Sequence, residues 1–458
     1  MPPQPTRSCD RCYSIKERCS WLQDSNRCAR CSRLGFSCGN TRPTKRVGRR
    51  ARLAGPLQAN SESTSMIPGT PSITETDLVY TILSDYDIYG NFLIGPAFWR
   101  QHHASLLSSF EQSRSILDHA YLASVLSVAH SKSSRVNLSQ DELLASYRHA
   151  SSALQNLRDM HITDAQQAAT SLILGTMIML FAMFTRPHNV YTLSRQTLIL
   201  LRPVYDIIPY PDPNHFFFLA GMTMLEMAGS LVYGAAPALK FRQPEDPLYV
   251  DRYLGVSTSL LPLLFQLCEL NRVVSTDHGG HDIHRITHSL DKLEAEALAW
   301  QPGASEGLCQ RFSAIEIAHI FCQAQVMRMA ALLILYRIRF PFGVHDLPAR
   351  GLGMSILTQL ESTLLVTGKP VKFVMVPVLV ACIELTEGAE RDRWMPQVPK
   401  LVCCSDGYGL YIQGVVRAFW AVRDAGIYFK GYNVSKYLYD EADSLVETLE
   451  GIKAQGTG

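Results

Sequence analysis

Six cysteines near the start of the chain have a spacing that could bind metal ions. They follow the pattern C-x2-C-x6-C-x8-C-x2-C-x6-C, at Cys9, Cys12, Cys19, Cys28, Cys31 and Cys38. The last three repeat the first three nineteen residues later, so the segment is a duplicated unit. Three thiolates cannot complete a tetrahedral zinc site, which takes four ligands. Two zinc ions that share two thiolates would be fully coordinated by six sulfurs. The spacing therefore predicts a binuclear zinc cluster, which can fold a segment too short for its own apolar core.

A disulfide framework and redox-active cysteines are the two alternatives for the same pattern. An even number of regularly spaced cysteines also suits a small secreted domain. Residues 1–7 are polar and proline-rich, without the apolar stretch of a secretory signal. We therefore expect a reducing compartment, where metal binding is favoured over disulfide formation.

This cysteine spacing resembles that of the fungal zinc binuclear cluster DNA-binding domain. The resemblance implies two bridging ligands and two further ligands for each Zn²⁺ ion: Cys9 and Cys28 as bridges, Cys12 and Cys19 at one metal, Cys31 and Cys38 at the other. It also implies that the module binds double-stranded DNA.

The same resemblance implies which side chains contact the DNA. In the family, a lysine three residues before the third cysteine reads a CGG triplet in the major groove, and here that residue is Lys16. Arg18, just before the third cysteine, would hold a phosphate. Residues 13–15 are less basic than is usual in the family, which weakens the expected phosphate contacts of this helix.

Charge is distributed unevenly along the 458 residues. Residues 1–53 contain thirteen Lys or Arg and three Asp or Glu, a net charge of +10, whereas the remainder carries a net charge of −8. A basic module on an acidic body is typical of a nucleic-acid-binding protein whose other surfaces do not compete for phosphate. We therefore expect residues 1–53 to form the DNA-binding domain.

A basic segment follows the sixth cysteine. Residues 42–52 contain six basic side chains and no acid. Such a segment suits a nuclear localisation signal, an arm along the DNA backbone, or both; a merely solvated charge run is the alternative. The segment also resembles the basic tail of aflatoxin-pathway-type regulators, which implies four further DNA contacts, at Lys45, Arg46, Arg49 and Arg50.

Residues 54–76 are rich in Gly, Pro, Ser and Thr, which predicts a flexible linker. Many relatives of the zinc cluster proteins carry a short coiled coil here, but the segment has no apolar heptads. The two alternatives are therefore a monomer and a homodimer formed through the large domain.

Residues 77–458 have helical periodicity throughout and no clear strand pattern, which predicts a large all-α domain. Tyr147, Ala150, Leu154 and Leu157 illustrate this periodicity, since they fall on one helical face. Further helical runs are expected at about 164–185, 216–233, 260–274, 283–300, 315–339, 354–365, 371–385, 410–423 and 436–451.

The uncharged segment 168–184 is seventeen residues long, the short limit for crossing a bilayer. Neighbouring runs are comparably apolar but carry charges, so we expect a buried core helix and no membrane partner.

The large domain also resembles the fungal-specific transcription factor domain. The resemblance depends on Tyr147-Arg-His-Ala, on the stretch 375–384, and on Trp420 in a late helix. It implies a regulatory domain, which a metabolite effector or a coregulator would control.

No pattern in the chain predicts catalysis. The sequence lacks a P-loop, a dinucleotide-binding glycine motif and a nucleophile elbow. The remaining cysteines have no ligand spacing and are expected to be small buried hydrophobic residues: Cys268, Cys309, Cys322, Cys382, Cys403 and Cys404.

Our sequence-based hypothesis is a nuclear, non-enzymatic transcription factor of RNA polymerase II genes, with a small zinc binuclear cluster module and a large all-α domain. Its likeness to aflatoxin-pathway regulators implies control of a secondary-metabolite gene cluster. A DNA-bound repressor or scaffold, and a metabolite-binding or enzymatic protein with an added zinc module, remain as alternatives.

Overall fold

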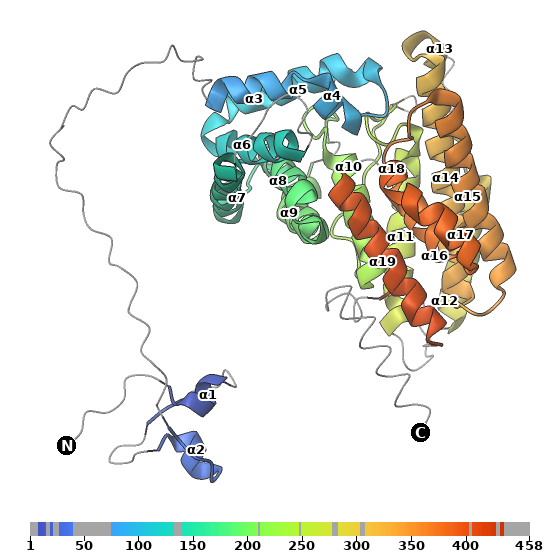
Figure 1. Ribbon diagram of the computed structural model, residues 1–458. Coiled ribbons are helices and arrows are strands. Elements are labelled where there is room, and N and C mark those ends of the chain that lie inside the picture. Colours follow the sequence, from blue (N-terminus) through green and yellow to red (C-terminus); the bar gives the residue numbers. More distant parts are fainter. Residues whose placement is uncertain are drawn as a thin grey trace, which may run out of the picture. The chain divides into compact units, whose positions relative to one another are not determined.

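The chain forms two compact units, Met1–Pro71 and Ser72–Gly458 (Figure 1). In this computed structural model the described residues are 8–14, 19–21, 27–39, 75–131, 140–208, 211–246, 249–276, 283–302, 307–402, 405–426 and 431–434. The predicted linker lies outside them apart from its last two residues, so the expected boundaries at 53/54 and 76/77 remain predictions.

The N-terminal unit contains two short helices, α1 (Asp10–Ser14) and α2 (Ala29–Arg33). Each begins directly after a cysteine, and the Cys28 side chain caps α2 by accepting a hydrogen bond from the N–H of Cys31. The buried residues of the described part are cysteines, with no aliphatic core around them. A segment this small needs a metal or cross-links to hold one conformation.

The second unit is all-α over its described residues, as the sequence predicted. Its long helices are α5 (Trp99–Gln112), α6 (Arg114–Ser131), α7 (Gln140–Asp159), α8 (Ala165–Thr185), α9 (Val190–Tyr205), α10 (Leu219–Tyr233), α11 (Leu261–Thr276), α12 (Ile283–Ala299), α14 (Ala314–Arg339), α15 (Asp346–Thr367) and α19 (Asp406–Asp424). Shorter ones are α3 (Glu75–Leu83), α4 (Tyr86–Tyr89), α13 (Leu308–Arg311), α16 (Met375–Ile383), α17 (Gly388–Trp394) and α18 (Val398–Val402).

Two groups of helices make up this unit (Figure 1). In the first group α8 packs against α6, α7 and α9, and in the second α14 packs against α11, α12, α15 and α16. Helix α10 contacts α9, α11 and α16, and so connects the groups. One continuous apolar core runs through both.

Local sequence explains where the two central helices begin. Asp164 caps α8 by accepting a hydrogen bond from the N–H of Gln167. Ser313 and Glu316 form a capping box at the start of α14, where each side chain accepts a hydrogen bond from the other residue's backbone N–H. Both helices then continue through long apolar runs into the core.

Helices α8 and α14 are long and apolar enough to cross a membrane by length and composition alone. Their most apolar windows are 89% and 61% buried inside the unit. Core helices of a globular unit pass the same test, and α8 is surrounded by other helices as expected for residues 168–184.

Several helix boundaries differ from the sequence-based expectation. Helices α5, α6 and α9 were not expected; α9 carries Pro203 in its last turn, and a proline usually indicates a helix end. Helix α15 begins at Asp346, eight residues before the run expected from Met354. The expected run 436–451 lies outside the described residues.

Candidate metal centre

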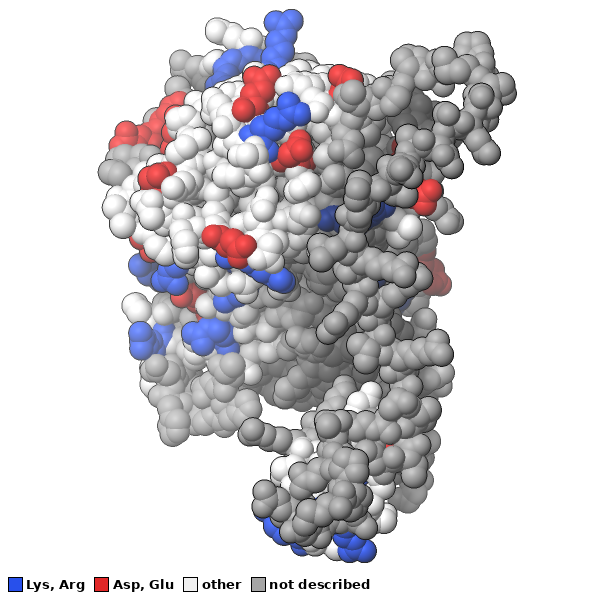
Figure 2. Space-filling model, turned by 90° about the vertical axis from the view of Figure 1, so that its left-hand side faces the viewer, with Lys and Arg blue, Asp and Glu red and all other residues white. Residues whose placement is uncertain are grey.

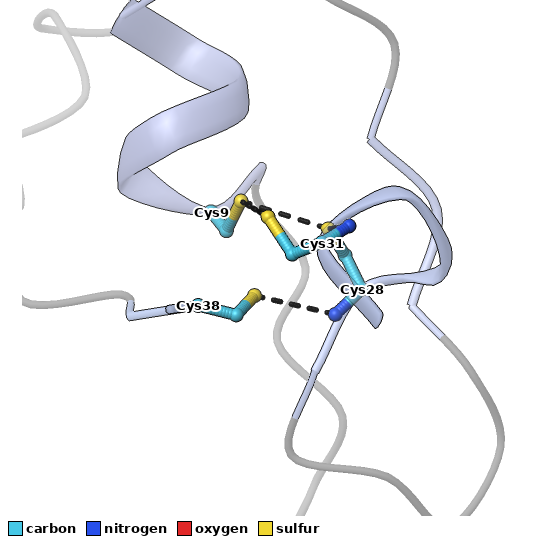
Figure 3. Close-up of side chains that lie close together, drawn as sticks. All are labelled: Cys9, Cys28, Cys31 and Cys38. Atoms are coloured by element: carbon cyan, nitrogen blue, oxygen red, sulfur yellow. Dashed lines mark hydrogen bonds between the residues drawn. The ribbon is translucent and has the colours of Figure 1, made fainter. Parts of the chain in front are cut away.

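The six N-terminal cysteines come together in two overlapping groups of four. The first group is Cys9, Cys12, Cys19 and Cys28, and the second is Cys9, Cys28, Cys31 and Cys38. Within each group the sulfur atoms lie within 4.8 Å of one another. Figure 3 shows the second group, with side chains from the two halves of the duplicated segment converging on one point. Cys9 and Cys28 belong to both groups.

Sulfur–sulfur distances fit thiolates around a tetrahedral metal. The Cys9 and Cys28 sulfurs are 3.7 Å apart, those of Cys9 and Cys31 3.8 Å, and those of Cys12 and Cys28 3.7 Å. Ligands about 2.3 Å from zinc at the corners of a tetrahedron lie about 3.8 Å from one another. A disulfide requires about 2.05 Å, and all six cysteines are free thiols. The donor set and its spacing therefore suit zinc, while the disulfide alternative does not fit.

The duplication seen in the sequence extends to the hydrogen bonds of the sulfurs. Each of these bonds in the first half recurs nineteen residues later with the same length. The Cys9 N–H donates to Cys19 Sγ, and the Cys28 N–H donates to Cys38 Sγ, both at 3.3 Å. The Cys12 N–H donates to Cys9 Sγ, and the Cys31 N–H donates to Cys28 Sγ, both at 3.4 Å. Backbone donors stabilise thiolates, which are the metal-binding form of cysteine.

Backbone hydrogen bonds join the two halves crosswise. The N–H of Asp10, at the start of the first half, donates to the carbonyl of Gly39 at the end of the second, at 2.9 Å. The N–H of Ala29 donates to the carbonyl of Ser20 at 2.8 Å, which is the equivalent bond with the two halves exchanged: its donor lies nineteen residues later and its acceptor nineteen residues earlier. Each half is thus completed by the other, and the module has approximate two-fold symmetry.

Ionisation is favoured most at the two shared cysteines. Burial is the largest single effect and opposes it, but the backbone N–H groups of Cys12 and Cys31 together with hydrogen bonds from neighbouring cysteine side chains outweigh burial, so the pKa of Cys9 is lowered and that of Cys28 falls to about 6. Burial and the neighbouring sulfurs raise the pKa of the four unshared cysteines, that of Cys31 to about 12. A sulfur that belongs to both ligand groups would contact two metal ions and so gains most from being a thiolate. The lowered pKa values of Cys9 and Cys28 therefore suit bridging ligands.

The six residues predicted to contact DNA all lie outside the described residues: Lys16, Arg18, Lys45, Arg46, Arg49 and Arg50. The described part of the module is basic nonetheless, with four arginines and one acid: Arg11, Arg27, Arg30, Arg33 and Asp10. The guanidinium of Arg11 lies 3.7 Å from the centre of the Phe36 ring, a cation–π contact that fixes its position.

On the face of the second unit drawn in Figure 2, basic and acidic side chains are interspersed rather than gathered by sign.

The residues behind the second resemblance have structural roles in the large unit. Tyr147 packs edge-on against Phe181 of α8. The stretch 375–383 is α16 and is completely buried. Trp420 of α19 donates its indole N–H to the carbonyl of Cys382, at 3.0 Å, and thereby joins α19 to α16.

The expectation of buried cysteines in the large unit was wrong for one residue. Cys268, Cys322 and Cys382 are buried, but Cys309 is exposed. It lies on α13, a single-turn helix at the surface, where the flanking Leu308 supplies the buried side chain. Cys403 and Cys404 lie outside the described residues.

Comparison with known proteins identifies the large unit. A family model described as "Fungal specific transcription factor domain" matches residues 91–435. No curated protein and no solved structure matches the chain. The matched segment covers most of the chain and nearly all of the all-α unit, and the N-terminal cysteine cluster is consistent with a six-cysteine zinc cluster. The protein is therefore a transcription regulator and belongs to the fungal specific transcription factor domain family.

Proposed function

We propose that this protein is a nuclear, sequence-specific activator or repressor of RNA polymerase II genes that reads CGG-type triplets through a two-zinc, six-cysteine cluster. The observation that carries the proposal is the pair of overlapping cysteine groups that share Cys9 and Cys28, in a chain whose larger unit belongs to a transcription factor family. In this proposal Cys9 and Cys28 bridge two Zn²⁺ ions, and the other four cysteines complete the two sites.

The two halves of the cluster differ in their capacity to bind DNA. Lys16 and Arg18 lie in the first half, whereas the positions nineteen residues later hold Gly35 and Ser37. The second half therefore lacks both the base-reading lysine and the phosphate-binding arginine at equivalent positions. One module would accordingly read one triplet, with phosphate contacts from Arg18 and from residues 45–50 of the basic tail.

Residues 54–76 serve in this proposal as the linker to an all-α regulatory domain at 77–458. That domain would carry regulation by an effector or coregulator and any homodimer contact, because the linker has no heptad pattern. Regulation rather than catalysis is its role. By resemblance to aflatoxin-pathway regulators, the target genes would form a secondary-metabolite cluster.

The test measures metal content and DNA selection on the same sample. The full-length protein is purified without chelator, its zinc content is determined, and it selects binding sites from random duplexes at near-physiological salt. Two zinc ions per chain and enrichment of CGG triplets are the expected result. Absence of zinc would overturn the cluster, while two zinc ions without any sequence enrichment would overturn sequence-specific reading by this chain alone.

A further inference from the structure

A cavity of about 450 Å³ lies in the all-α unit, away from the cysteine cluster in sequence. Its wall is formed by the start of α5, by α13, and by the segments 211–214, 244–246 and 249–252. Phe98, Val250 and three prolines give it apolar surface, and Arg252 and Arg311 are its basic residues. This volume is in the range of small-molecule sites.

Arg252 is a buried cation that forms no ion pair among the described residues. Its exposed fraction is only 4%, and one terminal guanidinium nitrogen, NH1, is buried without any hydrogen-bond partner. Its guanidinium carbon lies 5.2 Å from the centre of the Phe217 ring, a cation–π contact that supplies no negative charge. Arginine cannot release its proton at any pH that proteins tolerate, so a buried guanidinium needs an anion nearby.

The neighbouring carboxylate of Asp251 is engaged elsewhere. One of its oxygens accepts hydrogen bonds from the N–H groups of Tyr253 and Leu254, and the other accepts one from the Tyr249 hydroxyl at 3.0 Å. These bonds hold the turn that places Arg252. Asp251 attracts Arg252 through space, but the two side chains form no ion pair among the described residues.

The positive charge of Arg252 also affects the ionisation of a buried neighbour. His102 is buried next to this region, and burial together with the charge of Arg252 lowers the pKa of His102 well below its usual range. His102 is therefore neutral at neutral pH and adds no second positive charge beside Arg252. Its Nδ1 lies 3.4 Å from the Tyr253 hydroxyl, so its polar contact is made within the fold.

Acidic residues in the cavity wall limit which anions can enter. Asp212, Glu245 and Asp246 are exposed there, together with the exposed Arg311. Three carboxylates repel a dianion or polyanion more strongly than a single negative charge. A guanidinium, in turn, is well matched to a carboxylate, which can accept two parallel hydrogen bonds from it.

We propose that this cavity binds a small organic monocarboxylate, whose carboxylate neutralises Arg252 while its apolar part contacts Phe98 and Val250. The binding itself is independent of DNA reading. Its use as an effector signal depends on the proposed regulatory function.

Binding is tested on the full-length, zinc-loaded protein by calorimetric titration, with sodium benzoate and inorganic phosphate as probes. Ionic strength is held constant with sodium chloride at neutral pH. Benzoate should bind saturably and raise the melting temperature, and phosphate should bind more weakly because of the acidic wall. Arg252→Met should weaken benzoate binding about tenfold or more, as expected for loss of a charge-assisted hydrogen bond.

Two further variants make the result specific. Arg202→Met removes an exposed arginine of α9 that is outside the cavity wall, and it should leave benzoate binding unchanged. Glu245→Gln removes an exposed acid of the wall without disturbing the core, and it should strengthen phosphate binding more than benzoate binding. This second variant keeps the test decisive if Arg252→Met does not fold.

Absence of saturable benzoate binding to the parent protein would overturn the proposal, as would equal benzoate affinity in parent and Arg252→Met. Phosphate binding as tight as benzoate binding would overturn the monocarboxylate assignment. Lys16→Ala, which is expected to impair DNA reading, should leave benzoate binding unchanged, so failure of the DNA-reading proposal and failure of this one are distinguishable.

Discussion

Arg337 and Glu384 form an ion pair that is buried almost completely inside the all-α unit, with side-chain exposures of 2% and 0%. The guanidinium Nε lies 2.9 and 3.1 Å from the two carboxylate oxygens. Asp346, the first residue of α15, adds a second carboxylate 2.8 Å away, and the Phe342 ring centre lies 4.5 Å from the guanidinium carbon. The pair joins α14 to the end of α16.

Breaking this pair should destabilise the unit strongly. Arg337→Met leaves Glu384 buried without its partner, which typically costs about 3–5 kcal/mol. Urea unfolding of the variant and its parent measures this cost. Arg393→Met is the matched control: in its pair with Glu361 the side chains are 56% and 23% exposed, so this partly solvated pair should contribute only about 0–1 kcal/mol. Equal costs for the two variants would show that the buried pair has no special role.

Asp424 should make the stability of the all-α unit depend on pH. Two hydrogen bonds from Arg391, at 2.6 and 2.9 Å, lower the pKa of Asp424 below its ordinary value of 3.8. Because this pKa is lower in the folded than in the unfolded state, the carboxylate stabilises the fold at pH values above its ordinary pKa. This stabilisation is lost as the pH falls through the folded-state pKa. The stability difference between parent and Asp424→Asn should therefore shrink as the pH falls from 6 towards 3. A constant difference would argue against the effect.

Metal content should depend on which cysteine is replaced. Cys28 belongs to both cysteine groups and Cys38 to one, so Cys28→Ala should lose both zinc ions, whereas Cys38→Ala should keep more metal. Native mass spectrometry counts the ions per chain. Cys268→Ala, a buried cysteine of the large unit, is the control and should keep the full metal content. Equal zinc loss in the Cys28 and Cys38 variants would contradict a bridging role.

Lys16 should determine sequence preference. Lys16→Ala should cost about 1–3 kcal/mol on a CGG-containing duplex and relax the preference for that triplet. Affinities for a matched set of duplexes that differ in the triplet measure both effects. Unchanged preference in the variant would remove Lys16 from base reading.

Arg49 should contribute affinity without selectivity. Arg49→Ala should weaken binding to all duplexes alike and reduce the slope of log affinity against log salt by about one phosphate contact. Salt titrations of parent and variant on matched and scrambled duplexes measure this. A loss confined to the CGG duplex would instead indicate a base contact.

Long apolar helices were predictable from sequence because their periodicity and caps are local. The expected segment 164–185 differs from α8 by a single residue, since Asp164 is its cap. The start of α15 was missed because its first turns contain Pro348, Gly351 and Gly353. Gly353 is used for packing, not for a turn: a Cβ there would lie 3.1 Å from the carbonyl of Ala381 on α16.

The metal centre was more predictable than the cavity. A displacement of nineteen residues between cysteines is visible in the sequence and implies that the two halves meet. The crosswise bonds of Asp10 and Ala29 are not visible, because they depend on how the halves face each other. Arg252 stands in a polar, turn-like stretch that resembles a surface loop, whereas the ring that its guanidinium contacts belongs to Phe217, which is distant in the chain.

The sharing of Cys9 and Cys28 between the two cysteine groups also bears on how the module responds to its surroundings. The two groups depend on each other, because each takes one of its four sulfurs from the other half of the segment, and each half also takes a backbone hydrogen-bond partner from the other. Oxidation or alkylation of one shared thiol would disable the whole module in one step. Chemical damage at Cys9 or Cys28 is thus expected to act as an all-or-none signal, whereas damage at an unshared cysteine leaves the other group of four sulfurs complete.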